Sequence, residues 1–249
     1  MEDTSFTPFS LEGKYILVTG ASSGIGRGIA EACARMGATI YLSGRNNDRL
    51  LQVQLSLFGE NHQIIAADLN TTDGRQQLLS IVPQLDGIVY SAGIGQRKPC
   101  KLITSSDVDE VMNTNFKSIA LLQASLLQAK KIKKSSSIVF IASRAASSPS
   151  IGNAIYSASK GAIISYAKCL ALELAPRQIR VNCICPAMIW TDLILKGGLT
   201  REDLEAAQLE YPLKRYGEPS DVANLAIYLL SNASTWMTGS CIDLTGGGE

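Results

Sequence analysis

The amino-acid sequence predicts an α/β fold in which one doubly wound parallel sheet of about seven strands carries helices on both faces. Short β-rich segments alternate with helical segments along all 249 residues, which predicts βαβ units with right-handed crossovers. The β-rich segments are nearly continuous apolar runs, as is typical of strands that are covered on both faces. No linker-like segment interrupts the alternation, so we expect a single domain over residues 1–249.

The expected elements follow from these patterns in chain order. The β-rich runs predict strands at residues 15–19, 39–43, 63–67, 87–90, 137–142, 180–185 and 241–244. The helical patterns between them lie near residues 25–36, 47–58, 72–81, 105–130, 155–175 and 219–231. One connection, residues 187–217, is far longer than the others. It follows the carboxyl end of a strand, where open α/β sheets bind ligands, so we expect it to be a substrate lid.

Composition argues against several classes of function. With 23 basic and 22 acidic residues, the net charge of +1 indicates no basic face, so we do not expect nucleic acid as a partner. The basic run Lys130–Lys134 is expected to be a solvated helix end. No apolar run approaches the ~18–20 residues of a membrane span, and Met1–Thr4 lacks the apolar core of a signal peptide. We therefore expect a cytoplasmic protein without a membrane partner.

The cysteines and the single histidine predict no metal site. The six cysteines fit no zinc-binding spacing, and we expect them to be reduced thiols. Cys183 and Cys185 lie on one expected strand, where we expect them to face opposite sides. His62 is the only histidine in the chain, which argues against a His-ligated metal and against a Ser-His-Asp triad.

A glycine-rich turn follows the first expected strand. Thr19–Gly26 reads TGASSGIG, and its glycines permit a tight bend and a close approach of the backbone to phosphate. The helix that follows offers free N–H groups and the positive end of its dipole to a pyrophosphate. A glycine-rich turn without a ligand is the alternative. The position directly after the first strand favours a Rossmann-like dinucleotide site.

The second expected strand indicates which dinucleotide binds. A site for NAD(H) would place Asp or Glu at its end to bond the ribose 2′-hydroxyl, and no carboxylate is present there. Arg45 stands at this position instead, and its guanidinium suits a 2′-phosphate. We therefore expect NADP(H) rather than NAD(H); the alternative is that Arg45 is a solvated loop residue.

Tyr156 and Lys160 are four residues apart in an expected helix, so they lie on the same face, one turn from each other. A Lys ammonium beside a phenol favours the phenolate, so we expect Lys160 to lower the pKa of Tyr156 from about 10 toward 7. Such a phenol would be a proton donor and acceptor near working pH. The alternative is a half-buried ring beside a solvated charge.

The TGASSGIG segment at 19–26, Ser143, and Tyr156 with Lys160 together resemble the short-chain dehydrogenase/reductase family over essentially the whole chain. The resemblance implies hydride transfer between a nicotinamide and a ketone or secondary alcohol. It implies that Tyr156 exchanges the proton, that Lys160 lowers the pKa of Tyr156 and bonds the nicotinamide ribose, and that Ser143 orients the substrate oxygen. Asn115 matches the residue that holds a relay water.

The resemblance also implies the cofactor contacts. Asp68 would bond the adenine amino group, Ser91-Ala92-Gly93 stands for the family's Asn-Ala-Gly, and Thr191 would bond the carboxamide or the diphosphate. A helix cap or turn is the alternative role for Asp68 and Thr191. Ala187 replaces a family glycine. The full set of expected cofactor-binding residues is Gly20, Ser22, Ser23, Gly24, Ile25, Gly26, Arg45, Asp68, Leu69, Ser91, Ala92, Gly93, Tyr156, Lys160, Pro186, Ile189 and Thr191.

Among family members the chain is most similar to 3-oxoacyl-[acyl-carrier-protein] reductases, which implies a small-molecule carbonyl or alcohol substrate. A reductase of a free ketone, sugar or sterol is the alternative, and a non-catalytic NADP-binding regulator is another. Leu172 stands where that group has a basic carrier-docking residue, although Lys130 and Lys131 would also suit docking. The apolar lid residues would line the substrate pocket or pack the lid onto the core. The resemblance implies a homotetramer or homodimer.

Overall fold

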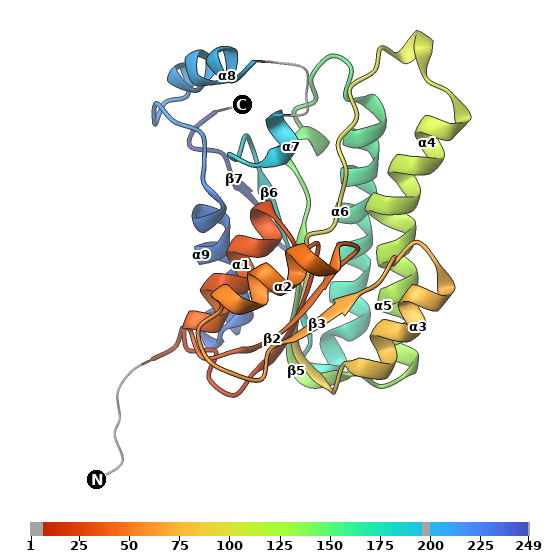
Figure 1. Ribbon diagram of the computed structural model, residues 1–249, viewed down its shortest axis with the longest axis vertical. Helices are drawn as coiled ribbons and strands as arrows, with labels where there is room; N and C mark the ends of the chain where they lie inside the picture. The colour runs from red at the N-terminus through yellow and green to blue at the C-terminus, as the bar shows by residue number, and fades with distance from the viewer. Residues whose placement is uncertain (1–6, 196–199, 249) are drawn as a thin grey trace.

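The structure is a computed structural model, and it describes residues 7–195 and 200–248. Its sheet has seven parallel strands in the order β3-β2-β1-β4-β5-β6-β7, which confirms the predicted doubly wound fold. Figure 1 shows helices on both sides of this sheet. The strands are β1 (Tyr15–Thr19), β2 (Thr39–Gly44), β3 (Gln63–Ala66), β4 (Leu85–Tyr90), β5 (Ile132–Ile141), β6 (Arg180–Pro186) and β7 (Cys241–Leu244).

The helices occupy nearly the expected positions. They are α1 (Gly24–Arg35), α2 (Asn47–Ser56), α3 (Thr72–Ile81), α4 (Ser105–Met112), α5 (Ser118–Gln128), α6 (Ala154–Leu174), α7 (Asp192–Leu195), α8 (Arg201–Ala207) and α9 (Pro219–Leu230). The expected helix over 105–130 is interrupted, because a π-helical turn at Asn113–Lys117 separates α4 from α5. The expected lid contains α7 and α8, and in Figure 1 both lie above the carboxyl ends of the strands.

Alternate residues of each central strand belong to two separate cores. In β1, Ile16 and Val18 pack with α1 and α9 on one face, whereas Leu17 packs with α5 and α6 on the other. Successive strand residues point to opposite faces, so a strand that is covered on both sides must be apolar at every position. Because both faces carry helices, ligands can approach the sheet only from its ends.

The basic run at 130–134 departs from the prediction. α5 ends at Gln128, and β5 begins at Ile132, so Lys133 and Lys134 belong to the strand instead of a helix end. Lys133 pairs with Asp86 of β4, with 2.7 Å between Nζ and Oδ2. This neighbouring strand supplies a long-range partner that no local sequence pattern indicates.

The expected orientation of two cysteines is also wrong. Cys183 and Cys185 are both buried in the core that contains α6, so they face the same side of β6. The physical reason is the two-residue period of a strand, which places residues i and i+2 on one face. No helix in the part of the chain that the structure describes is long and apolar enough to span a membrane.

The strand order reverses between β1 and β4, and this reversal places a crevice at the carboxyl ends of both strands. Gly20, directly after β1, has a φ of +65°, and a side chain there would lie 2.7 Å from Cα of Ala92, just after β4. A side chain at Gly26, in the first turn of α1, would lie 2.3 Å from the Gly20 carbonyl oxygen. α1 therefore starts directly against the loop that precedes it.

We expect Gly26→Ala to lower the free energy of unfolding by about 2 kcal/mol or more, because the added methyl group must push the loop away from α1. Gly161→Ala is a matched control, because Gly161 also lies in a helix but has no atom within 4 Å of the added carbon. It should stabilise the protein by about 0.5–1 kcal/mol. Urea denaturation measures both changes, and equal midpoints for the two variants would contradict this close packing.

Candidate active site

Three segments bring the four expected catalytic residues to the crevice beside β4. Tyr156 and Lys160 lie on α6, Ser143 lies just after β5, and Asn115 lies in the π-helical turn. Lys160 Nζ donates a hydrogen bond of 2.9 Å to the Ile141 carbonyl oxygen at the end of β5. The end of β5 therefore fixes both the Lys160 ammonium and, two residues later, Ser143.

The side chain of Ser143 acts on the phenol of Tyr156 and favours its ionised form. Burial raises the pKa of Tyr156, and the Ser143 hydroxyl offsets only part of this increase. The expectation that Lys160 lowers this pKa is wrong in the structure, because desolvation dominates and the ammonium faces the ring, 5.7 Å from its centroid. Tyr156 therefore holds its proton at neutral pH.

Lys160 is almost completely buried, with 5% of its surface exposed. Burial lowers its pKa from 10.5 to about 8, because the charged form loses its hydration. Lys160 therefore changes its charge within reach of physiological pH.

Gly93 lies between the two polar groups of this site. A side chain at Gly93 would lie 3.4 Å from Lys160 Nζ and 3.3 Å from Asn115 Oδ1. Asn115 Oδ1 also accepts a 2.8 Å hydrogen bond from the Ile94 amide, and Asn115 Nδ2 donates one of 2.9 Å to the Ile94 carbonyl. The segment after β4 is therefore clamped to the π-helical turn and passes directly beside Lys160.

The expected cofactor loop fits a pyrophosphate. Ser23 is the N-cap of α1 and makes no side-chain capping bond, and the first turn of α1 has no acidic residue. The amide groups at this helix end are thus open to an anion. Ser22 lies beside Gly44 at the end of β2, and Ile25 packs against the core. The loop therefore supplies backbone donors and a firm helix position, which are the features a dinucleotide requires.

Arg45 follows β2 directly and lines a cavity of about 300 Å³. Asn70, Ile94, Thr114 and Lys117 line the same cavity, which gives it an apolar wall, amide groups and two cations. These residue types suit an adenosine that carries a phosphate. Glu110 also lines the cavity, but no carboxylate stands at the end of β2.

Asp68 and Leu69 follow β3, where the resemblance places the adenine contacts. Asp68 Oδ1 accepts a 3.0 Å hydrogen bond from the Asn70 amide, and Leu69 packs against the core. One carboxylate oxygen of Asp68 thus stabilises a turn, which is the alternative role considered for this residue. Its other oxygen has no partner among the described residues.

The residues after β6 reach back to the cofactor loop. Thr191 contacts the loop, because a side chain at Gly24 would lie 3.1 Å from Thr191 Cγ2. Ile189 is buried, and Pro186 is the last residue of β6. Ala187 has no positive φ, so its replacement of a glycine introduces no backbone strain. The three expected contact residues therefore lie along one side of the crevice.

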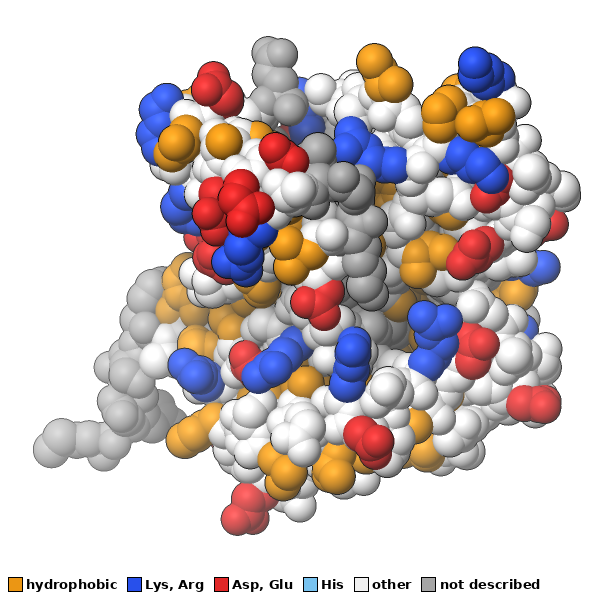
Figure 2. Space-filling view, turned by 45° about the horizontal axis from the view of Figure 1, so that its top comes forward, with side chains coloured by type: hydrophobic (Ala, Val, Ile, Leu, Met, Phe, Trp, Pro, Cys, Tyr) orange, Lys and Arg blue, Asp and Glu red, His pale blue; other side chains and the backbone are white. Residues whose placement is uncertain are grey.

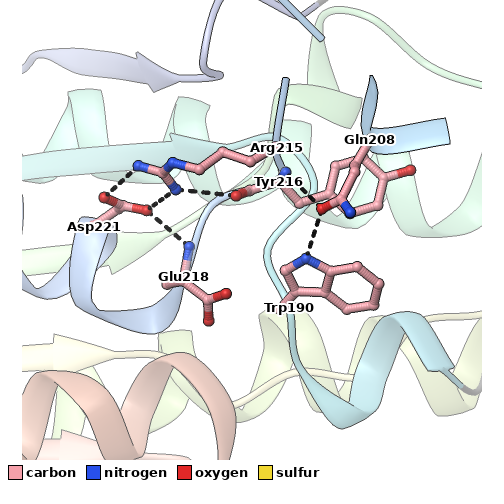
Figure 3. A network of polar contacts seen from close by, with 6 residues as sticks. All are labelled: Trp190, Gln208, Arg215, Tyr216, Glu218 and Asp221. Carbon is pink, nitrogen blue, oxygen red and sulfur yellow. Dashed lines mark hydrogen bonds and ion pairs between the residues drawn. The ribbon is translucent and has the colours of Figure 1, made fainter. Parts of the chain in front are cut away.

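The two ends of the expected lid are joined to each other (Figure 3). Trp190 Nε1 donates a 3.1 Å hydrogen bond to Gln208 Oε1, and the Trp190 and Tyr216 rings lie 5.4 Å apart. Arg215 binds both carboxylate oxygens of Asp221 at 2.7 and 3.1 Å, which anchors the lid to α9. Trp190 thus packs within the lid.

Other lid residues reach across the crevice. A side chain at Gly95, after β4, would lie 3.4 Å from Leu193 Cδ1, so α7 covers the segment that passes Lys160. Among the apolar lid residues, Leu193 therefore makes the contact with the segment after β4. The apolar residues expected to line the pocket or to pack the lid are Met188, Trp190, Leu193, Ile194 and Leu195. Lid residues 196–199 lie outside the described residues.

Two residues outside the expected set, Thr19 and Ile94, also hold the site together. Thr19 Oγ1 accepts hydrogen bonds from the Ser91 and Ala92 amides, at 3.2 and 3.3 Å, and so joins the ends of β1 and β4. Ile94 clamps Asn115 through its backbone. Thr19 begins the TGASSGIG segment and could have been found there, whereas a backbone contact such as that of Ile94 leaves no residue-type signal.

Among the residues that the structure describes, no group of three or more His, Cys, Asp or Glu side chains could hold a metal ion. Figure 2 shows Lys and Arg side chains interspersed with Asp and Glu on the face that carries the lid. The site therefore offers hydroxyl, phenol, amide and ammonium groups beside the glycine-rich loop.

Comparison with known proteins agrees with this geometry. Residues 20–248 match a family model described as enoyl-(acyl carrier protein) reductase. A 3-oxoacyl-[acyl-carrier-protein] reductase from Rickettsia felis is 33% identical over 237 residues, which cover 95% of this chain and 97% of the relative.

Two solved structures show the same fold with bound nucleotides. A putative NAD(P)-dependent gluconate 5-dehydrogenase from Beutenbergia cavernae with bound NADP has a TM-score of 0.87 and 30% identity, and the match covers 97% of this chain and 98% of that one. A 3-ketoacyl-(acyl-carrier-protein) reductase from Brucella melitensis complexed with NADH has a TM-score of 0.85 and 30% identity, with coverages of 96% and 99%. The chain therefore belongs to the short-chain dehydrogenase/reductase family, a family of NAD(P)-dependent oxidoreductases.

Proposed function

We propose that the protein is an NADPH-dependent reductase that converts a ketone to a secondary alcohol. The observation that carries this proposal is the protonated Tyr156 phenol, whose ring lies 5.7 Å from the ammonium of the buried Lys160, in the same crevice as Ser143 and the glycine-rich loop. Bound NADPH would supply the hydride. The residues of the chain would position the carbonyl and supply the proton.

Tyr156 would give its proton to the carbonyl oxygen as negative charge develops there. Its raised pKa keeps the phenol protonated at neutral pH, which suits the direction of carbonyl reduction. Ser143 would donate a hydrogen bond to the same oxygen and hold it beside the phenol. Lys160 would return a proton to Tyr156 and bind the nicotinamide ribose, and Asn115 would position the relay water that links Lys160 to solvent.

The preference for NADPH rests on Arg45. Its guanidinium lines the cavity beside the end of β2, and no carboxylate stands there to bond a 2′-hydroxyl. Family members bind both nucleotides, as the neighbours with NADP and NADH illustrate. A cation at this position would select the 2′-phosphate through charge-assisted hydrogen bonds.

We propose a 3-oxoacyl thioester as the substrate, because a curated relative reduces such a thioester on an acyl carrier protein. A cavity of about 600 Å³ supports carrier docking, because Lys130, Lys134 and Arg177 line it and no carboxylate among the described residues does. Lys133 also lines it, but its charge is paired with that of Asp86. Lys131 contributes less, since its ammonium bonds the Val82 carbonyl. Carriers with acidic surfaces would complement this cavity.

The basic cavity lies at the opposite end of β5 from Ser143. Because the pairing is irregular between Ile132 and Ser137, β5 covers the same length of sheet as the six residues of β4, roughly 20 Å. A carrier held at this end would serve the site of another subunit in the expected homotetramer or homodimer. A free sugar acid is the second candidate substrate, because a structural neighbour is a putative gluconate 5-dehydrogenase. A non-catalytic regulator is disfavoured, because all four catalytic positions are filled and are brought to one site.

We expect Tyr156→Phe to lower kcat for carbonyl reduction by about 10²–10⁴-fold, because the proton donor is lost. The affinity for NADPH should stay unchanged, since the ring and the cofactor loop remain. Tyr15→Phe is the control, because its ring lies at the other end of β1. NADPH oxidation at 340 nm and NADPH fluorescence measure the two quantities. Near-normal turnover of Tyr156→Phe would refute this role.

We expect Arg45→Ala to raise the KM for NADPH by about 10–100-fold, which corresponds to the loss of a charged hydrogen bond worth about 1.5–3 kcal/mol. The KM for NADH should not rise. Arg49→Ala, which removes an exposed guanidinium from the adjoining helix α2, should change neither constant. If Arg45→Ala affected both nucleotides equally, Arg45 would not recognise the 2′-phosphate.

If the basic cavity docks a carrier protein, a substitution there should raise the KM for a carrier-bound substrate and not the KM for a small thioester. We expect Lys134→Glu to raise the KM for a 3-oxoacyl carrier protein about tenfold or more, because like charges oppose the docking of an acidic partner. The KM for the N-acetylcysteamine thioester of the same acyl group should be unaffected. Arg35→Glu, an equal charge change at the exposed end of α1, serves as the control. Turnover of sugar acids but not of either thioester would instead favour the second candidate.

A further inference from the structure

The hydroxyl group of Ser159 joins two of the candidate catalytic residues. Ser159 has 0% of its surface exposed, and its Oγ donates a 2.7 Å hydrogen bond to the Tyr156 carbonyl oxygen. Ser159 Oγ also accepts a 3.0 Å hydrogen bond from Asn115 Nδ2. We infer that Ser159 is a positioning residue, which holds Asn115 against α6 in the arrangement that carbonyl reduction requires. This inference rests on the proposed function.

The bonds of Asn115 leave its amide only one orientation. One Nδ2 hydrogen goes to the Ile94 carbonyl and the other to Ser159, while Oδ1 accepts from the Ile94 amide. A flipped amide would place N–H against N–H and oxygen against oxygen at Ile94. Because Asn115 is completely buried, every one of these groups must be paired within the protein.

Ser159 connects separate elements at a point where the helix is irregular. Asn115 lies in the π-helical turn between α4 and α5, and Ser159 lies on α6. A π-helical turn is a rare, wide turn, and such turns occur frequently at functional sites. The bond between Ser159 and Asn115 therefore tethers the turn to the helix that carries Tyr156 and Lys160.

Breaking the bond between Ser159 and Asn115 would change the surroundings of the Lys160 ammonium. Asn115 Oδ1 and Lys160 Nζ both lie within 3.4 Å of the place that a side chain at Gly93 would occupy. If Asn115 moves, the space beside the ammonium can admit water, and hydration relieves the burial that lowers the pKa of Lys160 to about 8. The pKa of Lys160 should then rise.

The other titratable groups that face Lys160 do not obscure this change. Tyr156 on α6 has a pKa raised by burial, and burial raises the pKa of Cys185 on β6 to about 12. The pKa of Cys183 is also raised, mainly because its thiol bonds Cys241. These three groups stay protonated near pH 8. The bond with Cys183 lowers the pKa of Cys241 to about 7, so Cys241 titrates before Lys160 does, and the change near pH 8 belongs to Lys160.

The test compares Ser159→Ala with Ser157→Ala, a matched control two residues earlier on α6. The Ser157 hydroxyl is buried and has no partner among the described residues, so its removal breaks no hydrogen bond. We expect Ser159→Ala to lower kcat about tenfold, the kinetic equivalent of one hydrogen bond, and Ser157→Ala to leave it unchanged.

The pH profile distinguishes positioning from simple destabilisation. In the wild type, kcat for reduction should fall above pH about 8, because Lys160 loses its proton there. We call this fall the alkaline limb of the profile. In Ser159→Ala the alkaline limb should move to higher pH. In a double-mutant cycle, Ser159→Ala should have little further effect on Asn115→Ala. An unmoved limb, or an undiminished effect in the double mutant, would overturn the inference.

Two further measurements keep the test decisive. If Ser159→Ala does not fold, Ser159→Thr retains a hydroxyl that can bond the carbonyl three residues earlier, and it should keep both kcat and the limb near wild type. If the wild type reduces none of the carbonyl substrates, the proposed function fails. The same cycle measured by urea unfolding then tests the bond itself, and additive losses for Ser159→Ala and Asn115→Ala would show that the two residues are uncoupled.

Discussion

The contact between the loop after β1 and the segment after β4 is the constraint on which the rest of the site depends. Gly20 approaches the Ala92 backbone so closely that a side chain would lie 2.7 Å from its Cα, and Thr19 bonds the amides of Ser91 and Ala92. Gly93, the next residue, passes between Asn115 and Lys160. Because backbone touches backbone at this point, the glycine-rich loop and the candidate catalytic residues are held at one fixed separation. In the proposed function, the phosphates and the nicotinamide of one cofactor would reach both.

Burial decides the protonation state of the site. A sequence alone shows Tyr156 and Lys160 on one helix face, and Coulomb attraction then predicts a phenolate. The folded chain removes both groups from water, and desolvation disfavours each charged form. The phenol consequently stays protonated, and the ammonium becomes a weaker base than a solvated lysine. A neutral phenol beside an ammonium that titrates near pH 8 matches the needs of a reductase, which must release a proton and then regain one.

The elements that the sequence predicts well are those set by local patterns. The strand and helix positions follow from apolar periodicity. The spacing of Gly20, Gly24 and Gly26 predicts the glycine-rich loop after the first strand. The sequence does not predict the π-helical turn at Asn113–Lys117, the early start of β5 or the pairing of Lys133 with Asp86, because each depends on a distant segment. The spacing of Tyr156 and Lys160 also predicts the wrong direction for the pKa shift of Tyr156. The shift is dominated by burial, which depends on segments that are distant in the sequence.

These constraints support the proposal that hydride and proton reach the two ends of one carbonyl group. The most direct test of this claim is reduction of a 3-oxoacyl thioester by NADPH that carries deuterium on the transferred position of C4, followed by mass spectrometry and NMR of the alcohol. The expected product carries one deuterium, on the carbinol carbon, and its hydroxyl hydrogen exchanges with solvent. An alcohol without deuterium at that carbon, or no reaction with either the 3-oxoacyl thioesters or the sugar acids, would contradict the proposed hydride transfer.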